Sequence, residues 1–139
     1  MEGEGLGPSK WRQRDCITLI RAIVRELSGQ EPTFDLPDKG RGLTEEEVFL
    51  RAPREYGSLH KAWVALLEGE PLLKRASRKT LGSPGMIGLT PVRGFGMEGA
   101  AIPTRGPLIG VIGPDCALWV RTHHGLSRAW PVAQLWEVR

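Results

Sequence analysis

The sequence contains few cysteines and no long apolar run, and both shortages narrow the class of protein. Cys16 and Cys116 are its two cysteines and lie in opposite halves of the chain, which is typical of a reducing compartment rather than of a disulfide framework. No apolar run approaches the roughly 20 residues of a membrane-spanning helix, and no basic segment followed by an apolar one marks a secretion signal. We therefore expect unbridged thiols in a protein made in a cytoplasm, without a membrane span.

The chain also lacks the residue spacings of a metal site. Its three histidines are His60, His123 and His124, and neither a Cys-x-x-Cys pair nor a His-x-x-x-His pair is present. A zinc site built from both cysteines and the adjacent histidines would have no such pair to begin a chelate. We expect no metal and no cofactor.

The composition is that of one compact domain. The chain has 139 residues with 40% hydrophobic and 25% charged content and a net charge of +3, so its core needs no metal or disulfide. Residues 1–10 are Gly-rich and unpatterned, which predicts a flexible N-terminal arm ahead of a single domain at 11–139. The clearest basic cluster, KRASRK at 74–79, has no interleaved aromatic residues. Nucleic acid is therefore not expected as a partner.

Apolar residues at helical spacing follow Asp15, which is a favourable N-cap. Ser28-Gly29 supplies the glycine signal that ends this first helix. Pro, Asp and Gly then dominate residues 30–43, which predicts an irregular loop across the molecule.

Two further helices are expected before the midpoint of the chain. Thr44 and Glu47 stand at capping-box spacing in LTEEEVFLRA, and Pro53 is expected to stop that helix. Ser58 is a plausible N-cap for the helix in GSLHKAWVALLEG, whose apolar residues form one stripe.

The pattern changes to short strands after Gly82. Runs that are apolar or alternating, bounded by Gly and Pro, read GMIGLTPV, GPLIGVIG, CALWVRT and LSRAWPV, and HHG fits a tight turn between the last two. The final AQLWEVR fits either a strand or a short helix. We expect an α+β domain in which N-terminal helices pack on one face of a C-terminal, curved antiparallel sheet of four or five strands.

Cys16 opens the first predicted helix, and two interpretations of it stay open. A thiol in the first helical turn is favoured as a thiolate by the helix dipole, and Arg12 and Arg14 add positive potential. Nucleophilic chemistry also needs a base, normally histidine, on a neighbouring element. Without that base, Cys16 is a small apolar residue at the start of a core helix.

The segment WRQRDCITLIRAIVREL places Trp11 a few residues ahead of an Asp-Cys pair that opens an amphipathic helix. This start resembles that of the NlpC-like, papain-fold cysteine peptidases, and most of all their small divergent relatives encoded in tail modules of bacteriophages and gene transfer agents. GSPGMIGLTP, GPLIGVIGPDCALWV and RAWPVAQLWEVR are similar to strand regions of that family. The resemblance covers most of the chain from Trp11 onward. It implies a papain-like α+β fold with Cys16 at the nucleophile position.

The sequence departs from this family at the position of the base. In active members the catalytic histidine precedes a hydrophobic-Gly-hydrophobic strand core, and the corresponding residue here is Leu108. The family's Gly-Asp strand opening reads Gly85-Met86. A thiol without a positioned base remains a weak nucleophile at neutral pH. Divergent phage relatives of this family often lack the histidine as well, so the resemblance implies the fold while Leu108 argues against the activity.

The remaining candidates for the base are His123 and His124. Adjacent residues in a strand point to opposite faces, whereas at a hairpin tip both are exposed at the end of the sheet, away from the Cys16 helix. His60 is expected to be a surface residue of the third helix. Cys16 is thus a candidate or vestigial nucleophile, with His123 and His124 as the weaker candidates for its base.

The tryptophans bear on the choice of function. They are expected to lie partly in the core, with one or two anchoring a protein interface, where tryptophan is enriched. They are Trp11, Trp63, Trp119, Trp130 and Trp136.

These patterns lead to three candidate functions. The expected one is a structural or assembly protein of a phage tail or tail tip on a degenerate cell-wall-peptidase fold, located in the virion, with tail hub or tail-tip proteins and the bacterial cell wall as partners. The alternative is an active cysteine amidase that cleaves peptidoglycan peptides during genome delivery, in which Cys16 attacks the amide carbonyl and a histidine moves the proton. A nucleic-acid-binding accessory protein using KRASRK ranks third.

Overall fold

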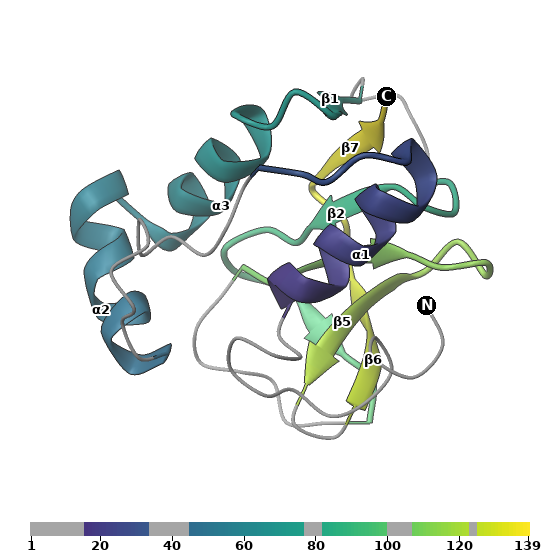
Figure 1. The fold of residues 1–139 in the computed structure, drawn as a ribbon. Coiled ribbons are helices and arrows are strands. Elements are labelled where there is room, and N and C mark those ends of the chain that lie inside the picture. Colours follow the sequence, from purple (N-terminus) through teal and green to yellow (C-terminus); the bar gives the residue numbers. More distant parts are fainter. Residues whose placement is uncertain (1–15, 34–44, 77–81, 100–106, 123–124) are drawn as a thin grey trace.

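The computed structural model describes residues 16–33, 45–76, 82–99, 107–122 and 125–139. Within these ranges, helices come first and strands follow, as expected of an α+β domain (Figure 1). The helices are α1 (Cys16–Ser28), α2 (Glu45–Tyr56) and α3 (Leu59–Glu68). The strands are β1 (Leu73–Arg75), β2 (Ile87–Leu89), β3 (Gly96–Met97), β4 (Ile109–Ile112), β5 (Leu118–Thr122), β6 (Gly125–Trp130) and β7 (Gln134–Val138). None of these helices is long and apolar enough to cross a membrane.

The described strands form one antiparallel sheet of seven strands in the order β1-β7-β2-β4-β5-β6-β3. The sheet is not closed, because β1 and β3 remain its edges. The expectation of four or five strands was wrong, since both edge strands are too short, at three and two residues, to show a period. The ambiguous C-terminal segment is a strand, β7, which pairs with both β1 and β2.

The first helix ends as its sequence predicts. Gly29 follows α1 with a φ of 71°, a left-handed conformation that glycine adopts without a steric penalty. Its N–H donates to the carbonyl of Arg25 at 2.9 Å, which satisfies one of the last carbonyls of the helix. The predicted N-cap, Asp15, lies outside the described residues.

The second helix corrects a prediction. Pro53 was expected to stop it, but α2 continues through Pro53 to Tyr56. Proline removes only its own N–H donor, which would pair with the carbonyl of residue 49. Val48 and Ala52 of the same helix are almost completely buried, and α2 packs along α3, so this apolar contact offsets the missing bond. Thr44, the predicted cap residue, lies outside the described residues.

The start of the third helix is confirmed. Ser58 is the N-cap of α3, and its hydroxyl oxygen accepts a hydrogen bond from the backbone N–H of Lys61 at 3.0 Å.

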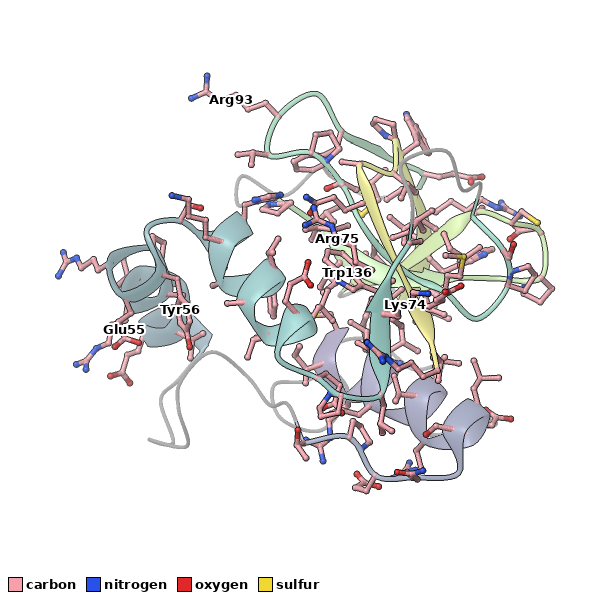
Figure 2. All side chains as sticks on the ribbon, turned by 90° about the horizontal axis from the view of Figure 1, so that it is seen from above. Glu55, Tyr56, Lys74, Arg75, Arg93 and Trp136 are labelled. Carbon is pink, nitrogen blue, oxygen red and sulfur yellow. The ribbon has the colours of Figure 1, made fainter. Side chains whose placement is uncertain are left out.

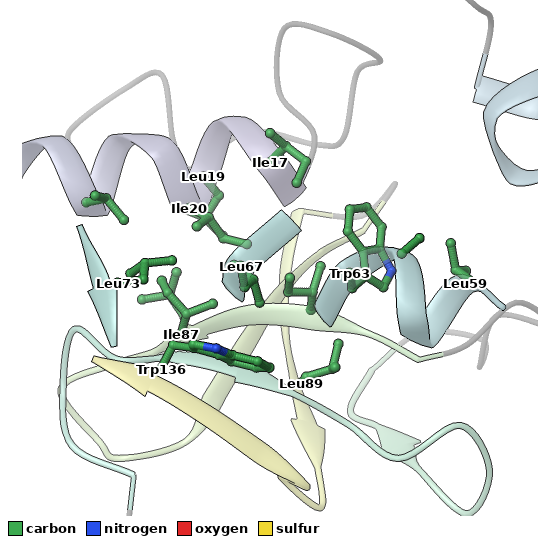
Figure 3. Packing of buried hydrophobic residues seen from close by; sticks show 14 of the residues in the cluster. Ile17, Leu19, Ile20, Leu59, Trp63, Leu67, Leu73, Ile87, Leu89 and Trp136 are labelled. Atoms are coloured by element: carbon green, nitrogen blue, oxygen red, sulfur yellow. The ribbon is translucent and has the colours of Figure 1, made fainter. Parts of the chain in front are cut away.

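The larger hydrophobic core joins the helices to one face of the sheet (Figure 3). It combines the buried stripes of α1 and α3 with alternate residues of the central strands. Its largest fully buried side chain is Trp136 on β7, which lies beneath the helices with Ile87 and Leu89. The contributors from α1 are Ile17, Leu19, Ile20 and Val24, and those from α3 are Leu59, Ala62, Trp63 and Leu67.

A second, smaller core lies against the opposite face and contains only residues from the β half of the chain. It joins Met97 on β3 to Leu135 on β7, although four strands separate β3 from β7 in the sheet order. The cluster thus runs along this face of the sheet from β3 to β7. The curvature expected from the sequence stays a prediction.

Candidate functional site

Cys16 is the first residue of α1, and its side chain is half-buried against the larger core. The helix contacts β4, β5 and β7, so Cys16 belongs to the layer in which α1 lies on the sheet. The helix dipole favours a thiolate at this position. No disulfide joins Cys16 to Cys116.

The strand β4 lies under α1 and presents apolar side chains to it. Ile109 and Val111 belong to the larger core, with the helices. Leu108 and Ile112 belong to the second core, on the other side of the sheet, as expected for alternating residues. The Leu108 backbone is fixed by Thr90, whose hydroxyl accepts from the Leu108 N–H at 2.8 Å and whose N–H donates to the Leu108 carbonyl at 2.9 Å. The structure therefore places Leu108 and Cys16 in different cores.

Neither side of the sheet offers Cys16 a base at positions 108 and 109. A side chain at position 108 points away from the helix layer, and the neighbouring position that faces α1 is Ile109. Neither side chain can accept a proton, so this segment supplies no base to Cys16 from either face of the sheet.

Of the three histidines, the structure describes only His60. His60 is half-buried on α3, next to Leu59 of the core, and α3 packs against α2 and β1. His123 and His124 lie outside the described residues. The predicted antiparallel pairing around them is confirmed, because Thr122 of β5 pairs with Gly125 of β6.

A metal site is not formed by the residues that the structure describes, since no group of three or more His, Cys, Asp or Glu side chains there could hold an ion. Cys116 lies in the turn between β4 and β5 and is exposed.

The described part of the basic cluster lies at the β1 edge of the sheet. Arg75 donates to Glu68 at 3.1 Å, and its guanidinium carbon lies 5.8 Å from the centre of the Trp136 ring (Figure 2). Lys74 pairs across the strands with Glu137. Each of these basic side chains thus has an acidic neighbour. Ser77, Arg78 and Lys79 lie outside the described residues.

A polar network that sequence reasoning missed connects the β4–β5 turn to β6. The Trp119 indole N–H donates to Asp115 Oδ1 at 2.9 Å, and Arg128 Nε donates to Asp115 Oδ2 at 2.9 Å. Arg128 also donates to Glu98 at 3.0 Å, and its guanidinium carbon lies 4.6 Å from the centre of the Trp119 ring. We call these four residues the Trp119 network.

The hydrogen bonds of the Trp119 network keep Asp115 and Arg128 charged over a wide pH range. Hydrogen bonds from Trp119, Arg128 and the Ala117 N–H lower the pKa of Asp115 to about 2. Asp115 and Glu98 in turn raise the pKa of Arg128. The one sequence signal for these residues was the alternating pattern of β5 and β6. The residues meet only through the register in which the two strands pair, and that register has no local sequence signal.

The tryptophans divide between core and surface, as expected. Trp63 and Trp136 are buried, Trp119 is half-buried, and Trp130 is 51% exposed. Trp11 lies outside the described residues.

Comparisons with protein-family models, with curated proteins and with solved structures returned no match for this chain.

Proposed function

We propose that the protein is a structural or assembly component of a phage tail or tail tip, built on an NlpC-like, papain-like scaffold that has lost its peptidase activity. The sequence resemblance supplies the family, and the α+β arrangement of α1 on an antiparallel sheet is compatible with it. The proposed place of action is the virion tail, after synthesis in the host cytoplasm.

The observation that carries the loss of activity is the apolar character of β4. Cysteine attack on an amide needs a base that takes the thiol proton and later donates a proton to the leaving amine. Leu108 and Ile109 occupy the two positions at the start of the strand beneath α1 and offer neither function. The half-buried Cys16 instead fills space beside the first turn of a core helix.

Assembly with tail proteins tests the proposal. Tails purified from the phage that encodes this chain should contain the protein, and the purified protein should co-elute with tail hub or tail-tip proteins on size exclusion. The Cys16→Ala variant should assemble equally well, because the proposal gives the thiol no chemical role. A protein that never associates with tails or their hub proteins would refute the proposal.

The alternative is an active cysteine amidase that cleaves wall peptides. One observation favours it, namely that Cys16 is the first residue of α1, where the helix dipole stabilises a thiolate. In this mechanism Cys16 attacks the amide carbonyl, helix-start N–H groups stabilise the oxyanion, and a histidine moves the proton. His123 and His124 are its candidate bases.

Cleavage of purified peptidoglycan separates the two functions. The amidase predicts released peptides, loss of release in Cys16→Ala and full release in the matched control Cys116→Ser, whose position lies in an exposed turn. The tail-scaffold proposal predicts no release by any of the three proteins.

A further inference from the structure

The helix-side face of the sheet continues past α1 onto β5, β6 and β3. Val111, which faces the helices, pairs with Trp119, and Trp119 pairs with Arg128. Directly opposed residues of antiparallel strands point to the same face, and Trp130 follows Arg128 by two positions, so it shares that face as well. Arg128 and Trp130 are both exposed. In Figure 1, α2 and α3 lie on the far side of the molecule from β6.

We call the set formed by the exposed Asp115, Glu98, Arg128 and Trp130 together with the half-buried Trp119 the indole surface. At two glycines, the absence of a side chain lets a tryptophan ring of this surface lie close to the backbone. A Cβ atom at Gly96, opposite Trp130, would lie 2.6 Å from the Trp130 indole nitrogen, and one at Gly113 would lie 2.6 Å from that of Trp119. Trp130 therefore rests against the bare backbone of Gly96 and still exposes 51% of its surface.

The polar part of the indole surface is already organised. Asp115 accepts hydrogen bonds from the Trp119 N–H and from Arg128 Nε, each at 2.9 Å. Glu98 accepts one from Arg128 Nη1 at 3.0 Å. A ligand that binds here does not have to order these side chains, so the entropic cost of binding is reduced. Within the described residues Glu98 receives a single hydrogen bond, and a carboxylate has about four lone-pair positions. It can therefore accept further hydrogen bonds from a ligand.

The described charges of this surface disfavour a polyanion. Two carboxylates and one guanidinium give the indole surface a formal charge of −1, so phosphate backbones are repelled rather than attracted. Stacking of nucleic-acid bases, which also uses aromatic rings, normally requires a positive groove. Nucleic acid is therefore the wrong ligand for these tryptophans.

The distribution of apolar residues argues against a protein partner at the indole surface. The core of a protein interface is a contiguous apolar patch. The exposed large apolar residues of the described chain are instead spread over α1, α2, the loop before β3 and the segment after β6; they are Leu27, Leu50, Val92, Trp130 and Val132. Val132 lies against Gly88 and not on this face, because Gly88 points toward Leu118 of the second core. Of these five residues, Trp130 is the one on the indole surface, where the other described members are the charged groups and the half-buried Trp119.

One exposed and one half-buried indole ring, beside fixed hydrogen-bonding groups with a formal charge of −1, match a ligand made of uncharged, hydroxyl-rich rings. We propose that the indole surface binds a saccharide chain, whose sugar rings stack on Trp130 and against the Trp119–Arg128 pair. The sugar hydroxyls donate to Glu98 and Asp115 and accept from Arg128. This binding role goes beyond the tail function and holds whether or not Cys16 is reactive.

The test is an NMR titration of the full chain with an uncharged hexasaccharide of β-1,4-linked N-acetylglucosamine, followed at the indole N–H signals. The signals of Trp130 and Trp119 should move in proportion to each other, whereas that of Trp136, which is 0% exposed, should stay. Trp130→Ala should weaken the affinity about five- to tenfold. The matched control Leu50→Ala removes another exposed apolar side chain, on α2, and should bind as the wild type does.

Three outcomes would overturn the proposal. One is the absence of any indole shift at millimolar saccharide, and another is unchanged affinity in a folded Trp130→Ala variant. The third is a shift of the same two signals by hexalysine or by a single-stranded oligonucleotide but not by the saccharide. Neither the saccharide titration nor these outcomes depend on tail assembly, so the two proposals can fail separately.

Discussion

Glu70 holds Thr33 by two hydrogen bonds, accepting the backbone N–H at 2.7 Å and the hydroxyl at 2.9 Å on the same carboxylate oxygen. Its other oxygen accepts the N–H of Leu72 at 3.3 Å. Glu70 is only 2% exposed. The hydrogen bonds of one buried carboxylate thus link the segment after α1 to the turn that joins α3 to β1.

Replacing Glu70 with alanine should lower the free energy of unfolding by about 2–4 kcal/mol, because Thr33 and Leu72 lose their charge-assisted hydrogen bonds to a buried carboxylate. Urea unfolding gives the value. The matched control is Glu68→Ala, which removes an exposed partner of Arg75 and should cost below about 1 kcal/mol. Equal losses in both variants would contradict the role assigned to Glu70.

Gly110 on β4 should not tolerate alanine. A Cβ atom there would run into the backbone carbonyl of Trp119 on the neighbouring strand, and a backbone atom within a sheet has little room to move. We expect Gly110→Ala to cost about 3 kcal/mol or more, or to prevent folding. Gly94→Asn is the control, because nothing lies within 4 Å of its Cβ position and its φ of 77° suits asparagine. A Gly110→Ala protein as stable as this control would refute the close approach of β4 and β5.

Asp115 should titrate near pH 2, followed by the NMR signal of its carboxyl carbon. Because the folded pKa lies below the ordinary value of 3.8, the carboxylate stabilises the fold above about pH 4, and this contribution is lost as the pH falls toward 2. Trp119→Phe keeps a ring under Arg128 but removes the indole N–H, the largest cause of the lowered pKa. The midpoint should then rise toward 3.8. An unchanged midpoint would show that Trp119 does not hold Asp115.

Pro53→Ala should stabilise the protein. Proline in a helix interior leaves the carbonyl four residues earlier without its backbone donor, and alanine restores that bond within α2. We expect a gain of about 1–3 kcal/mol in the free energy of unfolding. Alanine at the exposed neighbour Arg54 is the control and should change stability by less than about 0.5 kcal/mol. A loss of stability in Pro53→Ala would mean that the proline ring makes a packing contact worth more than the bond.

The helices were predictable because their signals are local. Ser58 and Gly29 act within one turn of the helix end that they define, and the stripe of α1 needs only its own sequence. The error at Pro53 came from tertiary packing, since a helix penalty was outweighed by burial of Val48 and Ala52. The edge strands β1 and β3 were missed because they are defined by pairing with β7 and β6 rather than by any pattern of their own.

In the candidate sites, too, the features set by local sequence could be predicted and those set by strand pairing could not. The position of Cys16 at a helix start follows from the residues around it. The separation of Leu108 from Cys16 depends on which face of β4 meets α1, and the contact of Trp119 with Arg128 depends on the register of β5 and β6. Neither relation has a local signature, so neither could be read from the sequence.

Competitive labelling of the two cysteines tests the proposed loss of peptidase activity most directly. The native protein is treated with substoichiometric iodoacetamide near pH 7, and labelling at each position is quantified by peptide mass spectrometry, with the unfolded protein as reference. If Cys16 is a side chain of the α1 layer, the exposed Cys116 reacts first and Cys16 is protected. Labelling of Cys16 well ahead of Cys116 would reveal an activated thiolate and contradict the account.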